Sequence, residues 1–338
     1  MAQDPQSENP QATELRHVAI AALPLWDLDV VAVKPIKVRE NAVYAVHLRD
    51  GSRVALRVHR LGYHSDAALD SEFQWCAALS RHGIDVPRVR PSRRGRPFER
   101  VAAAAGGTPR QVDVFEWIDG EQLGTSESGV DGDDATVARN YRTIGQLAAR
   151  MHNQAAAWQR PAGFARHAWD AEGLVGEQPR WGRFWELEAL TAAQRRTFAH
   201  LRERLRRELA EFGIDVARYG LIHADLVPEN VLVGPKGVRI IDFDDAGFGW
   251  HLFELATSVY FIRREACYPV ALQSFVTGYR EHRVLSDESL ARLTMFLAAR
   301  GTTYLGWVHT RKGEATAEEL TPGLIELAAA AADDYLSG

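Results

Sequence analysis

Alternating hydrophobic and polar positions in residues 30–59 predict a run of short β-strands. Branched apolar residues recur there in three runs, separated by polar residues. The Asp50-Gly51 dipeptide between the last two runs is a strong signal for a β-hairpin. Residues 14–24, by contrast, have helical spacing and end at a proline. The pattern therefore predicts a helix followed by an antiparallel meander with strands at 31–33, 43–48 and 54–58.

Helical spacing returns at Asp66, which we expect to open a helix that closes at Gly83. Two further strand-like runs follow, at 88–89 and 111–117. The chain up to Ile118 is thus expected to form a small sheet with one inserted helix.

After residue 118 the pattern is mainly helical, and the composition change near Trp117–Gly120 marks the expected domain boundary. Thr321 and Pro322 have the chemistry of an N-cap and a first helical turn, so the last helix is expected to begin there. The expected helices are 141–158, 191–212, 252–282, 286–311 and 322–336. The predicted division is a disordered tail at 1–14, a first domain at 15–117 and a second at 118–338.

Composition and charge fit a soluble protein with two cores. The 338 residues are 46% hydrophobic and 25% charged, with a net charge of −5. The only basic run, Arg93-Arg94-Gly95-Arg96, reads as a solvated turn, so nucleic acid is not a favoured partner. No apolar run has membrane-spanning length and the N-terminal residues lack a signal-peptide core. A cytoplasmic location is expected, and the oligomeric state cannot be read from the sequence.

The stretch from Tyr219 to Trp250 contains a predicted hairpin that groups several polar side chains. Strand-like runs at 231–233 and 238–241 flank Gly234-Pro235-Lys236-Gly237. With the turn centred between Pro235 and Lys236, Asn230 pairs near Ile241. Asp242 then lies beside Asn230 at the open end of the hairpin.

An amide and a carboxylate placed side by side suit a hard cation such as Mg²⁺, which takes few protein ligands. Asp225 lies five residues before Asn230, where it could accept a proton from an attacking hydroxyl. Asn and Asp at strand ends are also common turn residues, which is the alternative interpretation. His223, Asp225, Asn230 and Asp242 together around one hairpin favour the functional one.

The pattern His223-x-Asp225-x4-Asn230, followed by Asp242-Phe243-Asp244, resembles the catalytic loop and metal motif of the aminoglycoside phosphotransferase and choline kinase superfamily. Members of this superfamily resemble protein kinases in fold. Weaker matching segments keep the family's order, among them "ALRVHR" (55–60), "VFEWIDGEQL" (114–123) and "FELATSVY" (253–260). The resemblance implies an α+β, two-lobed fold, with a small antiparallel-sheet N-lobe carrying one inserted helix and a larger, mainly helical C-lobe.

The resemblance also implies roles for individual residues. Residues 15–117 would bind the nucleotide, and residues 118–338 would carry the catalytic loop and the substrate site. Asp225 would be the catalytic base, and His223 would brace the loop. The metal ligands would be Asn230, Asp242 and Asp244, and the nucleotide would meet Arg57, Glu72, Glu116, Trp117 and Ile118.

Two departures from the family pattern bear on activity. Arg57 stands where the phosphate-binding residue is commonly lysine, with Glu72 as its expected partner. Strand alternation leaves a second interpretation open, in which Arg57 simply faces water. Residues 36–46 contain no glycine, which argues against a conventional protein kinase, and no P-loop motif occurs.

The sequence therefore predicts an enzyme that uses ATP and Mg²⁺ to phosphorylate a hydroxyl of a small molecule. Two alternatives stay open: a bacterial stress-response-type protein Ser/Thr kinase, and a non-catalytic nucleotide-binding module. The acceptor and the preference for ATP over GTP are not readable. Acidic residues of the C-terminal half such as Glu254 are offset by arginines such as Arg300, so no aminoglycoside is singled out.

Overall fold

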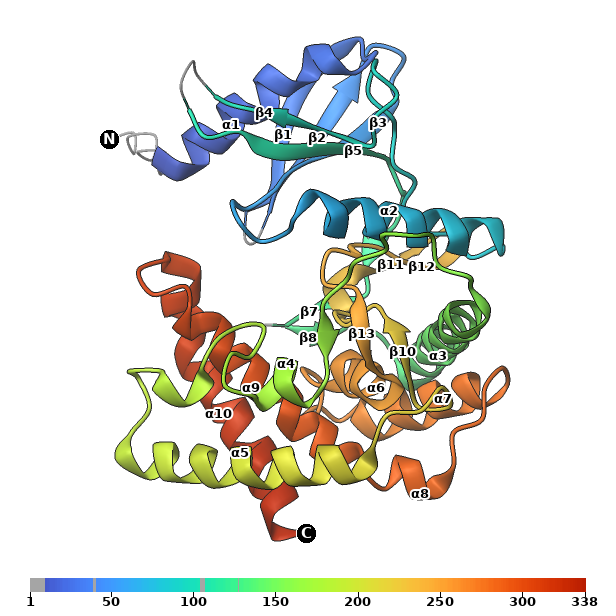
Figure 1. Cartoon of the computed structure of the whole chain (residues 1–338). Coiled ribbons are helices and arrows are strands. Elements are labelled where there is room, and N and C mark those ends of the chain that lie inside the picture. The colour runs from blue at the N-terminus through green and yellow to red at the C-terminus, as the bar shows by residue number, and fades with distance from the viewer. Residues whose placement is uncertain (1–9, 39–40, 104–106, 127) are drawn as a thin grey trace. The chain divides into compact units, whose positions relative to one another are not determined.

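The computed structural model describes residues 10–38, 41–103, 107–126 and 128–338 (Figure 1). The chain divides into two compact units. Unit 1 comprises Met1–Ala77 and Pro87–Ile118, and unit 2 comprises Ala78–Val86 and Asp119–Gly338. Both units together contain the small antiparallel sheet and the mainly helical region that the kinase-like fold requires.

Unit 1 is built on a five-stranded antiparallel sheet with the order β1-β2-β3-β5-β4. Helix α1 (Pro10–Ala22) precedes the sheet, beginning before the expected residue 14, and residues 1–9 of the predicted tail lie outside the described residues. The strands are β1 (Val30–Val38), β2 (Ala42–Leu48), β3 (Arg53–Val58), β4 (Phe98–Val101) and β5 (Arg110–Glu116). The three strand runs predicted between residues 30 and 59 are therefore present.

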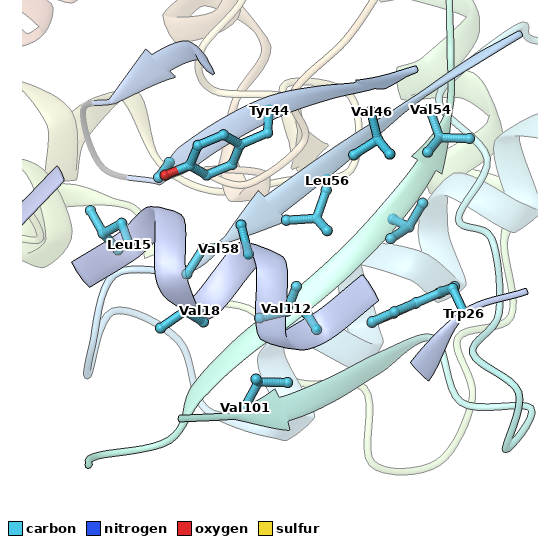
Figure 2. Packing of buried hydrophobic residues seen from close by; sticks show 14 of the residues in the cluster. Leu15, Val18, Trp26, Tyr44, Val46, Val54, Leu56, Val58, Val101 and Val112 are labelled. Carbon is cyan, nitrogen blue, oxygen red and sulfur yellow. The ribbon is translucent and has the colours of Figure 1, made fainter. Parts of the chain in front are cut away.

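One face of this sheet is covered by α1, which supplies the first core. Leu15 and Val18 of α1 lie among the side chains of Leu56, Val58 and Val112 from the strands (Figure 2). All five side chains are buried. Full burial of such side chains contributes about 1.5–3 kcal/mol each, so this small sheet has a core of its own.

Local chemistry differs from expectation at the start of α2 (Asp66–Arg81). The Oγ of Ser65 accepts a hydrogen bond from the backbone N–H of Ala68, so Ser65 caps the helix. Asp66 is already helical, and its carboxylate pairs with Arg100 at 2.7 Å. Strand β4, which contains Arg100, was not predicted, because its four residues Phe-Glu-Arg-Val are too short to show a period.

Unit 2 is mainly helical and also contains short paired strands. The hairpin of β11 and β12 is extended by β6, and β10 pairs with β13, which pairs with β9. The helices are α3 (Asp134–Ala157), α4 (Ala171–Val175), α5 (Ala192–Phe212), α6 (His251–Val259), α7 (Tyr268–Arg280), α8 (Asp287–Leu290), α9 (Leu293–His309) and α10 (Ala315–Ser337). The strands are β6 (Glu121–Gln122), β7 (Gly124–Thr125), β8 (Gly129–Val130), β9 (Ala168–Trp169), β10 (Tyr219–Ile222), β11 (Val231–Gly234), β12 (Gly237–Ile240) and β13 (Gly247–Trp250).

Three helix predictions in unit 2 were wrong. The helix expected over 286–311 is divided into α8 and α9. The helix expected over 252–282 is two helices, because the chain leaves α6 after Val259 and α7 starts anew with Pro269 in its first turn. The last helix begins at Ala315, so Pro322 lies inside α10. The Oγ of Thr321 donates to the carbonyl of Ala317 at 2.6 Å, inside the helix rather than at a cap.

Across the described part of the chain, no helix combines the length and the apolar character needed to cross a lipid bilayer.

Candidate active site

The β11–β12 hairpin of unit 2 brings the predicted polar residues to one end. Val231 pairs with Ile240, and the N–H of Ile241 donates to the carbonyl of Asn230 at 2.9 Å. This is the predicted register, and it follows from the tight turn between Gly234 and Gly237. Asp242 therefore comes directly after the residue that pairs with Asn230.

Asp225 and Asn230 are joined directly across the loop that enters the hairpin. The Nδ2 of Asn230 donates to the carboxylate Oδ2 of Asp225 and also to its backbone carbonyl, both at 2.8 Å. Asn230 is buried in a 3₁₀ turn over Pro228–Asn230, whereas the Asp225 side chain is 23% exposed. The loop thus presents a carboxylate whose orientation is fixed by a buried amide.

His223 links this loop to the hairpin from inside the protein. Its Nδ1 accepts the backbone N–H of Asp225 at 3.2 Å, so Nε2 must carry the proton that is donated to the carbonyl of Ile241 at 2.9 Å. Burial lowers the pKa of His223, although the charge of Glu254 opposes the shift. The imidazole therefore acts as a neutral brace, tying the backbone of Asp225 to the residue before Asp242.

Two non-glycine residues of the site have left-handed backbone conformations. Ala224 has a φ of 65° and Asp242 a φ of 64°, and they are the only such residues in the described segments. This conformation costs an L-residue about 1–2 kcal/mol, so the surroundings must hold it in place. Such strain is concentrated at functional sites, and here it flanks both Asp225 and the end of the hairpin.

Glu254 on α6 holds the strained loop by its backbone. Its two carboxylate oxygens accept the N–H groups of His223 at 2.8 Å and Ala224 at 2.7 Å. The side chain is fully buried, and burial raises its pKa while these donors oppose the shift. His152 lies behind it, with Nε2 3.6 Å from Oε1, and burial lowers the pKa of His152 to about 3.

Arg300 on α9 approaches the same loop from the other side. Its Nη1 donates to the carbonyl of Ala224 at 3.1 Å and its Nη2 to Oδ1 of Asp225 at 2.7 Å. The sequence showed Glu254 and Arg300 only as opposing charges of the C-terminal half and did not predict their contacts with this loop. A charged residue inside an apolar helical stretch, such as Glu254 in His-Leu-Phe-Glu-Leu-Ala, is the one signal that could have drawn attention to it.

The segment after Asp242 is also buried. Arg166 donates to the backbone carbonyl of Asp244, and the indole Nε1 of Trp169 donates to the carbonyl of Asp245 at 2.9 Å. The side chains of Asp244 and Asp245 are both buried. Two neighbouring acidic residues are thus held in place close to the hairpin, and the role of Asp244 as a metal ligand stays a prediction.

The donor set at the hairpin suits a magnesium ion. The amide nitrogen of Asn230 is used in bonding to Asp225, and the backbone register places Asn230 and Asp242 at the same end of the hairpin. Among the residues that the structure describes, no three His, Cys, Asp or Glu side chains form a metal-binding group. A site with one carboxylate and one amide matches Mg²⁺, which keeps water and substrate phosphates as its other ligands.

Unit 1 places Arg57 in a buried ion cluster. Its Nη2 donates to Glu72 at 2.8 Å, which is the predicted pairing, and to Asp113 at 2.9 Å. His59 also meets Asp113, at 2.7 Å. Burial alone would raise the pKa of Asp113. The charges and hydrogen bonds of Arg57 and His59 have the larger effect, so the pKa is lowered overall. Arg57 therefore does not face water, and the alternative interpretation of this strand position is excluded.

The residues predicted to meet the adenine base lie where β5 ends. Glu116 is exposed, and its backbone N–H donates to the carbonyl of Arg88 at 2.9 Å. The guanidinium of Arg53 lies 4.3 Å from the ring centre of Trp117. Unit 1 ends at Ile118, and the contact of Glu116, Trp117 and Ile118 with a nucleotide stays a prediction.

Comparison with known proteins agrees with this geometry. The chain is 33% identical to a solved structure described as the microcompartment-associated aminopropanol kinase, with a TM-score of 0.80 over 94% of this chain and 96% of that chain. It is 25% identical to amicoumacin kinase of Bacillus subtilis over 80% of this chain and 77% of that protein. An uncharacterized protein of Deinococcus radiodurans is 32% identical over 79% of this chain and 74% of its own length.

The sequence model of the phosphotransferase enzyme family matches residues 32–285, which include the sheet of unit 1 except the first two residues of β1, and all residues from His223 to Asp242. The chain belongs to the phosphotransferase enzyme family.

Proposed function

We propose that the chain transfers the γ-phosphoryl group of ATP, bound with Mg²⁺, to the hydroxyl of a small amino alcohol. The observation that carries this is the Asp225 carboxylate, fixed by Asn230 at 2.8 Å next to the end of the hairpin that holds Asp242. In this arrangement the Asp225 carboxylate would face the acceptor, and the oxygens of Asn230 and Asp242 would face the cation. Phosphoryl transfer needs both, because its catalysis is mainly positioning and charge neutralisation.

Asn230 and Asp242 would hold the magnesium, with Asp244 as a further oxygen donor. The bound ion would neutralise charge on the phosphate oxygens. The neutral His223 keeps this pair in register with Asp225, since it bonds the carbonyl of Ile241 on one side and the N–H of Asp225 on the other.

Asp225 would accept the hydrogen bond of the acceptor hydroxyl and take its proton during transfer. The carboxylate is the partly exposed member of its cluster, at 23%, and so can be reached by a substrate. The donors behind it, Asn230 on Oδ2 and Arg300 on Oδ1, hold the carboxylate in one orientation.

Nucleotide phosphates would be steadied by Arg57, oriented by Glu72. Glu72 and Asp113 fix the guanidinium at 2.8 and 2.9 Å, and its permanent positive charge would attract the phosphates. The backbone groups of Glu116, Trp117 and Ile118 would pair with the base.

The proposal of an amino alcohol rests on two observations. The aminopropanol kinase that is 33% identical covers 94% of this chain, and the name of its substrate implies an amine and a hydroxyl. The carboxylate of Asp245, next to the proposed metal ligand Asp244, adds negative charge after the hairpin, which would favour a cationic amine.

A transfer assay with γ-labelled ATP tests the proposal. We expect labelled product with short amino alcohols, weaker labelling with the matching alcohols that lack the amine, and none with protein substrates. Asp225→Ala should lower turnover by about 10²-fold or more, the size of a general-base contribution. Asp333→Ala, at an exposed position of α10, is the control and should be as active as wild type. Equal transfer to amine-free alcohols would refute the acceptor class, and wild-type turnover in Asp225→Ala would remove Asp225 from the mechanism.

A further inference from the structure

Arg300 is a fully buried cation directly behind the proposed catalytic carboxylate. Its side chain is 0% exposed, whereas that of its partner Asp225 is 23% exposed. Its Nη2 donates to Oδ1 of Asp225 at 2.7 Å, and its Nη1 donates to the carbonyl of Ala224 at 3.1 Å. The guanidinium therefore holds both of these consecutive residues. A single side chain thus contacts the strained residue and the reactive residue of the loop.

The guanidinium is surrounded by aromatic rings. Its central carbon lies 4.4 Å from the ring centre of Tyr304, 5.0 Å from that of Trp181 and 5.6 Å from that of Phe253. The hydroxyl of Tyr304 accepts a bond from Nη2 at 2.7 Å. Rings placed this way attract a cation and resist its movement, so the position of the guanidinium is fixed independently of Asp225.

A buried ion pair is a poor stabilising device, because desolvation of the two charges offsets much of their attraction. Apolar residues would fill the space among Trp181, Phe253 and Tyr304 at least as well. The charge is explained if its purpose is the orientation of the exposed partner. Asn230 binds Oδ2 of Asp225 and Arg300 binds Oδ1, so together they fix both the place and the plane of the carboxylate.

We propose that Arg300 is a positioning residue for phosphoryl transfer: it holds the Asp225 carboxylate in the orientation that receives the acceptor hydroxyl. This inference rests on the proposed function of Asp225. Arg300 itself touches no substrate, because its side chain is fully buried. Its removal should therefore act on the chemical step and leave nucleotide binding as it is.

Arg300→Ala is the first test, measured by steady-state kinetics with ATP and an amino alcohol. We expect kcat to fall by up to about 10²-fold, the cost of a misplaced reacting group, with KM for ATP unchanged. Arg263→Ala is the matched control, because Arg263 is also a nearly buried arginine of unit 2, paired with Asp334 at 3.3 Å. A general effect of removing a buried arginine would appear equally in both variants.

Chemical rescue separates positioning from packing. The alanine variant leaves a space lined by Trp181, Phe253 and Tyr304 that matches a guanidinium ion. Added guanidinium, far below denaturing concentrations, should restore part of the lost kcat. Urea has a similar planar shape without the charge, and it should restore none. Rescue by both would show that filled volume suffices, and this result would overturn the proposal.

Conservative variants cover the case in which Arg300→Ala does not fold. Arg300→Lys keeps the charge without the planar fork, and Arg300→Gln keeps hydrogen bonding without the charge. We expect kcat to fall in the order wild type, Lys, Gln, with KM for ATP constant. Folded Lys and Gln variants that both turn over like wild type would overturn the proposal.

The Asp225→Ala protein distinguishes the two levels of inference. If Asp225→Ala is inactive while the Arg300 variants keep wild-type kcat, Arg300 is structural and the proposed function stands. If Asp225→Ala keeps wild-type turnover, the proposed function of Asp225 fails and the role of Arg300 fails with it.

Discussion

The two units each contain a buried arginine bonded to carboxylates, but the exposed partner differs. In unit 1 the arginine is the more accessible member, since the side chain of Arg57 is 6% exposed and that of Asp113 is 0% exposed. In unit 2 the carboxylate is accessible, since Asp225 is 23% exposed and Arg300 is 0% exposed. The unit 2 pair therefore exposes its anion, whereas both members of the unit 1 pair are buried, with Arg57 the slightly more exposed of the two.

This difference matches what each unit is proposed to bind. Nucleotide phosphates require a positive group, which Asp113 and Glu72 hold from behind at 2.9 and 2.8 Å. An acceptor hydroxyl requires a negative group, which Arg300 and Asn230 hold from behind at 2.7 and 2.8 Å. In both clusters the buried partners set the geometry, and the more exposed residue would meet the ligand.

The largest effect is expected from removing the buried partner in unit 1. Asp113→Ala leaves Arg57 buried with Glu72 as its remaining carboxylate, and loss of one member of a buried pair costs about 3–5 kcal/mol of unfolding free energy. Denaturant unfolding measures this. Asp29→Ala is the control, because its pair with Arg49 is exposed and such pairs contribute about 1 kcal/mol or less. Similar small losses in both variants would mean that the unit 1 cluster does not hold Arg57.

Acid should distinguish the two units next. Burial lowers the pKa of His152 to about 3, so below about pH 6.5 the unfolded chain binds a proton that the folded chain does not. Stability then falls with decreasing pH by up to about 1.4 kcal/mol per pH unit. The lowered pKa of Asp113 reduces stability only when the pH falls below about 3.9, which is the pKa of Asp in an unfolded chain.

Hydrogen exchange between pH 7 and pH 5 should therefore show the helices of unit 2 losing protection while the sheet of unit 1 keeps it. His152→Gln, which removes one of the buried histidines of unit 2, is the control and should weaken this dependence, while His251, whose pKa is also lowered by burial, keeps part of it. Equal loss of protection in both units, unchanged by His152→Gln, would contradict this difference between the units.

The smallest effect concerns the strained backbone at Ala224. Glycine at this position avoids the left-handed penalty of about 1–2 kcal/mol, but it adds about 0.5–1 kcal/mol of chain entropy and removes a buried methyl group that contributes about 0.8 kcal/mol, so Ala224→Gly should change stability by less than about 0.5 kcal/mol. Ala77→Gly, at an exposed position within α2, should instead destabilise by about 0.5–1 kcal/mol. Destabilisation by Ala224→Gly that is larger than that by Ala77→Gly would show that the Ala224 conformation carries no strain, because the buried methyl group is lost at Ala224 alone.

Local chemistry explains which features could be predicted. The register that places Asn230 opposite Ile241 follows from four residues of turn, 234–237, so the sequence alone contained it. The strands of unit 1 alternate clearly and were also predictable. The helix error at 252–282 was avoidable, because Pro269 marks a new first turn. Pro322 led to the opposite error: it predicted the start of a helix, but α10 begins earlier and continues through it.

The supports of the site were not predictable from one sequence. Glu254 meets Ala224 across 30 residues and Arg300 meets Asp225 across 75 residues, and no local pattern identifies either partner, although the apolar stretch around Glu254 marks that residue as unusual. The pairing of Asp113 with Arg57 was equally unpredictable, because 56 residues separate the two in the sequence. Motifs report the residues that would meet a ligand, while the charges that hold them come from tertiary packing.

The central claim is that residues around one hairpin have separate roles: Asn230 and Asp242 bind the cation, and Asp225 binds the acceptor hydroxyl. Calorimetry of ATP binding with and without Mg²⁺ tests it most directly, on wild type, Asp242→Ala and Asp225→Ala. We predict that Asp242→Ala loses the magnesium-dependent part of the affinity, while Asp225→Ala keeps it and loses turnover. Magnesium-dependent affinity that survives in Asp242→Ala, or disappears in Asp225→Ala, would contradict the account.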